Sequence, residues 1–146
     1  MQVRELCVQY RARPDLPPFD YQRVLSNPRE LVDFLLPILG QEPVEVFVMV
    51  CLTTKFHLLG FHEVARGSID NVHVAPRDIF KTAILSNAAM FVVAHNHPSG
   101  DPTPSPDDVA ITRAIAAGAQ LMSVPILDHI VIGDGRYFSF KEGGQL

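Results

Sequence analysis

The chain has 146 residues, of which 47% are hydrophobic and 19% charged, and its formal net charge is −4. This length and composition are typical of one soluble globular domain, and the lack of net positive charge argues against a nucleic-acid-binding surface. Cys7 and Cys51 are too few for a disulfide framework and lack the spacing of a thiolate zinc site, so we expect structural thiols in a reducing cytoplasm.

Residues 1–27 are predicted to form an N-terminal extension to a domain that occupies residues 28–146. Residues 1–20 contain three prolines and no sustained hydrophobic period, which predicts at most one early strand and then an extended segment. Arg4 and Glu5 interrupt any secretory signal pattern, and the apolar runs fall short of the ~20 residues that a membrane helix needs. We therefore expect a cytoplasmic protein that does not associate with membranes.

A helix is predicted to begin at Pro28, because Asn27 is a favourable N-cap and proline fits the first helical position. Apolar residues follow at helical spacing, and Gly40 is expected to end the helix. Residues 44–52 form a nearly continuous apolar run, which is typical of a buried strand, and a second strand is predicted over residues 56–66.

The middle of the chain is predicted to hold a second helix. Residues 67–75 are mixed, with a short strand expected through Val72 and Val74. The helix is predicted over residues 77–86, directly after Pro76. Four apolar residues at helical spacing are expected to form its inner face: Ile79, Phe80, Ala83 and Ile84.

The C-terminal half alternates strands with one more helix. A strand is predicted over residues 89–95, and three prolines and a glycine exclude regular structure from the loop 97–104. A third helix is predicted from Ser105 to about Gly118. The last two strands, joined by a tight Gly133-Asp134-Gly135 turn, are predicted over residues 126–132 and 136–140. This order predicts a mixed α+β domain with one central sheet flanked by helices.

Two histidines at the end of the predicted strand 89–95 suggest a metal site. Side chains alternate along a strand, so the imidazoles of His95 and His97 point the same way and lie close enough to bind one ion. Asp108 follows eleven residues after His97, and its helical phase places it beside Ile115 on the buried side. A buried carboxylate needs a partner, and two nitrogens plus one carboxylate oxygen are the ligand set of a catalytic zinc ion.

Each remaining candidate residue has a structural alternative. Ser105 and Asp108 also have the spacing of a capping box at a helix start, although Asp107 is the better candidate for simple capping. A catalytic zinc site also needs a carboxylate base, for which Glu45 and Glu63 are both candidates. Glu45 begins the most apolar strand, where an acid without a role is costly, and its alternative is an exposed residue at a strand end. Glu63 lies on a half-exposed strand, where its alternative is an ordinary solvated acid.

His129 also has two interpretations. We expect a core histidine that bonds to Asp128 or to the backbone. The alternative is a histidine that orients a metal ligand from behind.

The spacing of these residues resembles that of a known motif. His95-x-His97, seven residues, Ser105, two residues and Asp108 match the JAMM (MPN-plus) metalloprotease motif. Over residues 28–142 the chain resembles bacterial RadC-family proteins, through the blocks Val-Ala-Pro-Arg-Asp (74–78), Ala-His-Asn-His-Pro-Ser-Gly-Asp-Pro-Thr-Pro-Ser (94–105) and Leu-Asp-His-Ile-Val-Ile-Gly (127–133). This resemblance implies a JAB/MPN domain, which is related to the cytidine-deaminase-like α/β architecture.

The same resemblance assigns roles to the candidate residues. It implies one zinc ion held by His95, His97 and Asp108, with water as the fourth ligand, and Ser105 as a stabiliser of the oxyanion. It also selects Glu45 as the general acid and base, because the family glutamate opens the first central strand. The implied activity is hydrolysis of a peptide or isopeptide bond in a peptide or protein substrate.

A different class of function is the alternative. The domain would then be a non-catalytic or DNA-repair-associated module that uses its metal for structure or for partner docking. Many RadC proteins carry an N-terminal region that resembles a helix-hairpin-helix DNA-binding module. The segment before residue 27 is short, proline-rich and not basic, so we expect no such module and little DNA binding. The sequence makes no prediction of the oligomeric state.

Overall fold

The computed structural model describes residues 1–67 and 73–146. In chain order, its elements are α1 (Pro28–Leu39), β1 (Val46–Leu52), β2 (Leu58–Arg66), α2 (Pro76–Leu85), β3 (Met90–Asn96), α3 (Pro106–Met122), β4 (Ile126–Gly133) and β5 (Arg136–Ser139). The predicted α+β fold with one central sheet is confirmed. None of the helices in the described part of the chain has the length and apolarity that crossing a membrane requires.

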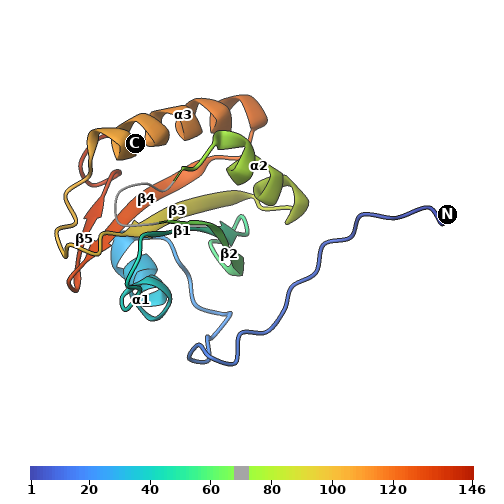
Figure 1. Ribbon diagram of the computed structural model, residues 1–146, viewed down its shortest axis with the longest axis horizontal. Coiled ribbons are helices and arrows are strands. Elements are labelled where there is room, and N and C mark those ends of the chain that lie inside the picture. The colour runs from blue at the N-terminus through green and yellow to red at the C-terminus, as the bar shows by residue number, and fades with distance from the viewer. Residues whose placement is uncertain (68–72) are drawn as a thin grey trace.

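The five strands form one mixed sheet in the order β2-β1-β3-β4-β5. All neighbouring pairs are antiparallel except β3 and β4, which α3 connects as a parallel crossover. Helix α1 covers one face of the sheet, and α2 and α3 cover the other (Figure 1). The N-terminal segment runs away from this body toward the far right of the view, and no strand forms within residues 1–23.

The central strands are buried on both sides, so their alternating residues belong to two separate apolar clusters. In β1, Val46 and Val48 pack toward α1, whereas Phe47 and Met49 pack toward α2 and α3. All seven residues of β1 are buried, as the continuous apolar run predicts. The alternation assigns every residue of the central strands to one helix layer or the other.

Helix α3 extends to Met122, about one turn beyond the predicted end near Gly118. The glycine does not stop the helix, because it leaves room for a neighbouring ring. A Cβ atom at Gly118 would lie 2.5 Å from the ring of Phe80 on α2, so the glycine allows the two helices to pack closely. The helix ends instead at Ser123, which adopts a left-handed conformation with φ 56°.

Several local predictions differ from the structure. Ile84 is exposed, so only the other three predicted residues of α2 face the core. Cys51 is buried, as expected of a structural thiol. The same prediction is wrong for Cys7, which is exposed. Val74 belongs to no strand, and Val72 lies outside the described residues.

Asp128 has a structural role, because its hydrogen bonds connect the C-terminal turn to the sheet. Its carboxylate accepts hydrogen bonds from the backbone N–H of His129 at 2.7 Å, the N–H of Lys141 at 3.0 Å and the hydroxyl of Ser139 at 2.6 Å. Burial raises the pKa of Asp128, and these donors oppose that effect.

Replacing Asp128 with alanine should lower the free energy of unfolding by about 3 kcal/mol, because two buried donors and one partly buried donor lose their acceptor. Urea denaturation measures this loss. Asp33→Ala, at an exposed position on α1, is the matched control and should change stability by less than ~0.5 kcal/mol. Equal effects of the two substitutions would contradict the structural role of Asp128.

Candidate metal centre

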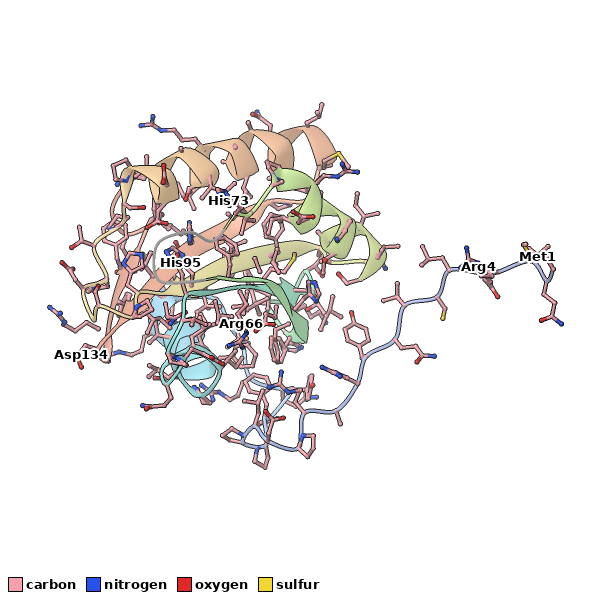
Figure 2. The ribbon with its side chains drawn as sticks, in the orientation of Figure 1. Met1, Arg4, Arg66, His73, His95 and Asp134 are labelled. Carbon is pink, nitrogen blue, oxygen red and sulfur yellow. The ribbon has the colours of Figure 1, made fainter. Side chains whose placement is uncertain are left out.

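The alternation of β3 places both candidate histidines on the α3 side of the sheet. Val93 packs into the cluster beneath α2 and α3, and His95 follows two residues later on the same face. His97 comes directly after the strand and keeps the pairing, since its N–H donates to the carbonyl of Ile132 at 2.8 Å. Figure 2 shows His95 on the same side of the molecule as Asp134 and far from Met1 and Arg4 of the N-terminal segment.

The pairing of β1 with β3 places Glu45 at the same position. Phe47 is the register partner of His95, so in an antiparallel pair Glu45, two residues earlier, lies opposite His97. Glu63 lies elsewhere, on exposed surface, where its carboxylate pairs with Arg66 at 2.6 Å. Of the two acids considered as a base, only Glu45 joins the histidines.

Asn96, between the two histidines, points to the opposite face and fixes the chain that leads to Glu45. Its side-chain carbonyl accepts from the N–H of Val46 at 2.8 Å, and its amide donates to the carbonyl of Val44 at 2.9 Å. The two contacts lie on either side of Glu45 in the sequence. The backbone on both sides of the acid is therefore tied to the strand that ends in the histidines.

Asn96→Ala should lower the free energy of unfolding by about 2 kcal/mol, because two backbone groups near β1 lose their partners. The same substitution at another asparagine, Asn87, is not a suitable control, because its φ of 56° favours asparagine over alanine. Asn87→Ala would therefore lower stability for a different reason. Asn96→Asp is more informative: it keeps the acceptor for Val46 but directs an oxygen at the carbonyl of Val44. Chemical denaturation should rank both variants below the wild-type protein, and wild-type stability in either would contradict the assigned contacts.

The capping box and the candidate site share the same residues at the start of α3. The hydroxyl of Ser105 accepts from the N–H of Asp108 at 3.1 Å, and the Asp108 carboxylate accepts from the N–H of Ser105 at 2.8 Å. The capping box is therefore present, and it does not exclude a role of Asp108 in binding a metal. The cap fixes the Asp108 carboxylate in place while both of its oxygens reach the histidines.

Four potential ligand atoms lie within 4.8 Å of one another, from Glu45, His95, His97 and Asp108. The two Nε2 atoms of the histidines are 3.1 Å apart, and each lies 3.2 Å from an oxygen of Asp108. Zinc bonds of about 2.0 Å in a tetrahedron separate neighbouring ligand atoms by about 3.3 Å. The two imidazoles and the carboxylate are therefore spaced closely enough to share one metal ion, with Oδ1 of Asp108 next to His95 and Oδ2 next to His97. An oxygen of Glu45 lies further out, 3.7 Å from Nε2 of His95.

The other ring nitrogen of His97 is also occupied. Its Nδ1–H donates to the backbone carbonyl of Asp101 at 2.8 Å, within the proline-rich loop. This contact leaves a lone pair on Nε2 of neutral His97, which is the form that binds a metal. The loop itself packs against the β4–β5 turn, where a Cβ atom at Gly133 would lie 2.7 Å from the carbonyl oxygen of Gly100.

A cation would also stabilise the cluster electrostatically. The hydrogen bond with Asp108 raises the pKa of His97, although burial opposes the shift. Burial raises the pKa of Asp108, but its contacts with His95 and His97 outweigh that effect and hold this pKa far below its ordinary value. A carboxylate and two imidazoles that converge in this way are stabilised by a shared positive charge, either a proton or a metal ion.

The centre opens to solvent on one side. The side chain of His95 is fully buried, whereas those of Asp108, His97 and Glu45 are 12%, 16% and 19% exposed. Structural zinc sites are closed by four protein ligands, whereas catalytic sites keep one accessible position. The partial exposure is the pattern expected of an accessible site.

The expectation that His129 is a core histidine is confirmed, and its backbone N–H bonds to Asp128. Its ring, however, bonds neither to Asp128 nor to the backbone. The ring is fully buried, with one nitrogen 2.9 Å from Nδ1 of His95 and the other 2.6 Å from the hydroxyl of Thr112. Burial lowers the pKa of His129 well below its ordinary value, so the ring is neutral. Sequence reasoning missed Thr112, although its spacing of four from Asp108 places both on one helix face.

Comparison with known proteins gives the family of this chain. A family model described as RadC-like JAB domain matches residues 25–145. The chain belongs to the RadC-like JAB family.

Curated relatives in this family include proteins from bacteria and archaea. UPF0758 proteins of Desulfitobacterium hafniense and Methanosarcina mazei are 41% and 39% identical to the chain over 123 residues, which is 84% of the chain. A UPF0758 protein of Moorella thermoacetica is 42% identical over the same length. The chain spans about half the length of these relatives, since the aligned part is 54% of each. Their names state no activity.

Proposed function

We propose that this JAB domain is a zinc-dependent hydrolase of peptide or isopeptide bonds. The observation that carries the proposal is the convergence of Glu45, His95, His97 and Asp108 within 4.8 Å at a partly exposed position. Two imidazoles and one carboxylate would hold the ion, and nitrogen and oxygen ligands of this kind suit zinc. When bound, zinc supplies a Lewis acid that polarises an amide carbonyl and acidifies water.

Glu45 has the position and the chemistry of a general base. Its oxygen lies further from Nε2 of His95 than Oδ1 of Asp108 does, so it is better placed beside an attacking water than as a third protein ligand. The carboxylate would take a proton from that water and return it to the leaving amine. The hydrogen bonds of Asn96 to Val44 and Val46 hold the backbone around this acid.

Ser105 would stabilise the negative charge that develops on the carbonyl oxygen. Its hydroxyl accepts the N–H of Asp108 through a lone pair, which leaves the hydroxyl hydrogen to be donated. A donor fixed by a helix cap is preorganised for this role, because its position does not have to change during the reaction. The capping geometry and the catalytic role therefore use different parts of one side chain.

Metal analysis and a peptide-library cleavage assay test the proposal together. Protein purified without chelator should contain about one equivalent of zinc, and it should cleave a subset of the library. Prolonged dialysis against a chelator should abolish cleavage, and added zinc should restore it. Stoichiometric metal without any cleavage would favour the non-catalytic module, and protein that binds no metal would contradict both functions.

A further inference from the structure

A continuous chain of hydrogen bonds runs behind the candidate metal centre. It begins at Nδ1 of His95, which lies 2.9 Å from Nε2 of His129, and continues from Nδ1 of His129 to the Thr112 hydroxyl at 2.6 Å. It ends at the backbone carbonyl of Asp108, 2.6 Å from the same hydroxyl. The chain joins two of the candidate ligands through residues of β4 and α3.

The direction of every proton in this chain follows from its last member. A backbone carbonyl only accepts, so the single hydrogen of Thr112 must point to Asp108. The Thr112 oxygen can then only accept from His129, which places the His129 proton on Nδ1. Nε2 of His129 is left with a lone pair and accepts the Nδ1–H of His95. Nε2 of His95 therefore carries a lone pair, directed at His97 and Asp108.

We propose that His129 is a positioning residue, which with Thr112 fixes His95 in the tautomer and orientation that bind a metal through Nε2. This inference rests on the proposed metal site and adds residues that support it. Ligand histidines are usually fixed by a carboxylate, a carbonyl or a water molecule. Here a second imidazole has that role, and its own tautomer is fixed by a helix residue.

The surroundings of His129 agree with a fixed ring. It stacks on Phe140 with a centroid distance of 4.7 Å and an interplanar angle of 9°, and Phe47 contacts its edge at 5.6 Å. An apolar residue would fill this space without needing partners, whereas an imidazole there requires both of its hydrogen bonds. The two bonds it makes lead to His95 and toward Asp108, which are the residues whose orientation the site depends on.

Nuclear magnetic resonance of the histidine ring nitrogens tests the tautomers in the metal-free protein at mildly alkaline pH. Wild-type protein should carry the proton on Nδ1 in both His95 and His129. A His95 proton on Nε2 would overturn the inference. This measurement does not depend on zinc, so it is separate from the test of the proposed function, which fails if the wild-type protein binds no zinc.

Two matched substitutions at Thr112 test the consequence for metal binding. Thr112→Val removes the hydroxyl at nearly constant volume, which frees His129 to place its proton on Nε2 and to turn His95 into the wrong tautomer. The Kd for zinc, measured by competition with a chelating dye, should rise by at least about tenfold. Thr112→Ser keeps the hydroxyl and should retain both the wild-type tautomer and the wild-type Kd.

A second pair at position 129 covers the case in which Thr112→Val does not fold. His129→Gln keeps a side-chain oxygen as an acceptor for Nδ1 of His95 and should bind zinc more tightly than His129→Leu. A merely structural role predicts that zinc affinity follows stability, with no change in the tautomer of His95. Equal zinc affinities within both pairs would overturn the inference.

Discussion

Glu45→Gln should lower the turnover of the zinc-loaded protein by at least about a hundredfold while leaving one equivalent of zinc bound. Glutamine has nearly the same shape as glutamate, but it cannot take a proton from water. The proposed ligands, which are the other three members of the donor cluster, stay intact, so metal content should not change: His95, His97 and Asp108. Metal analysis and cleavage rates measured on the same preparation check both parts of this prediction.

Glu63→Gln is the matched control, because it makes the same chemical change on an exposed part of β2. Its turnover should stay close to that of the wild-type protein. If both variants cleaved at the wild-type rate, Glu45 would not be the base. Loss of zinc from Glu45→Gln would instead make Glu45 a metal ligand.

Asp108→Asn should weaken zinc binding by at least about a hundredfold, with little change in the secondary structure of α3. Zinc binding at protein sites is worth roughly 10–16 kcal/mol, so one of four ligands accounts for about 3 kcal/mol. Asparagine keeps a side-chain oxygen that can accept the N–H of Ser105, so the helix cap survives. The substitution therefore separates the two roles that Asp108 combines.

Asp107→Asn controls for the loss of one negative charge at the same helix end, since Asp107 is exposed and is not part of the donor cluster. Isothermal calorimetry with zinc should give a wild-type Kd for this variant. Circular dichroism should give the same helix content for both variants and the wild-type protein. Equal zinc affinity of the two variants would contradict the assignment of Asp108 as a ligand.

The site contains residues whose relative positions follow from local sequence periodicity and residues whose positions depend on strand register. His95 lies in β3 and His97 directly follows it, while Ser105 caps the first turn of α3, which holds Asp108. The relative positions within each pair therefore follow from the periods of 2.0 and 3.6 residues. The pairing of Glu45 with the histidines depends instead on the register between β1 and β3. No local pattern contains that register, and the family resemblance was needed to choose Glu45 over Glu63.

The role of His129 depends on tertiary structure even more than that of Glu45 does. Its ring meets His95 because β4 pairs with β3 in parallel, and it meets Thr112 because α3 lies across both strands. The neighbouring Asp128 suggested the wrong partner, since adjacent residues of a strand point to opposite faces. Alternation alone could have excluded a bond between the two side chains within one straight strand.

The helix limits show the same division between local and distant causes. The start of α3 follows from Ser105 and Pro106, which are local signals. Its end does not follow from Gly118, because the ring of Phe80 on another helix occupies the space beside that glycine. A glycine in isolation predicts a helix end, whereas here it is a packing site.

By itself the sequence determined the class of fold, the buried strands, the helix starts and the three candidate ligands, since each depends on spacings within a few residues. The family resemblance selected Glu45 as the acid, but only the tertiary structure brought Glu45 to the candidate ligands and decided which residues lie behind them. Those choices bring together segments that are distant in the chain, such as Glu45 with His97 and Thr112 with His129. Contacts of that kind depend on the strand register and helix packing of the whole domain, which no single segment encodes.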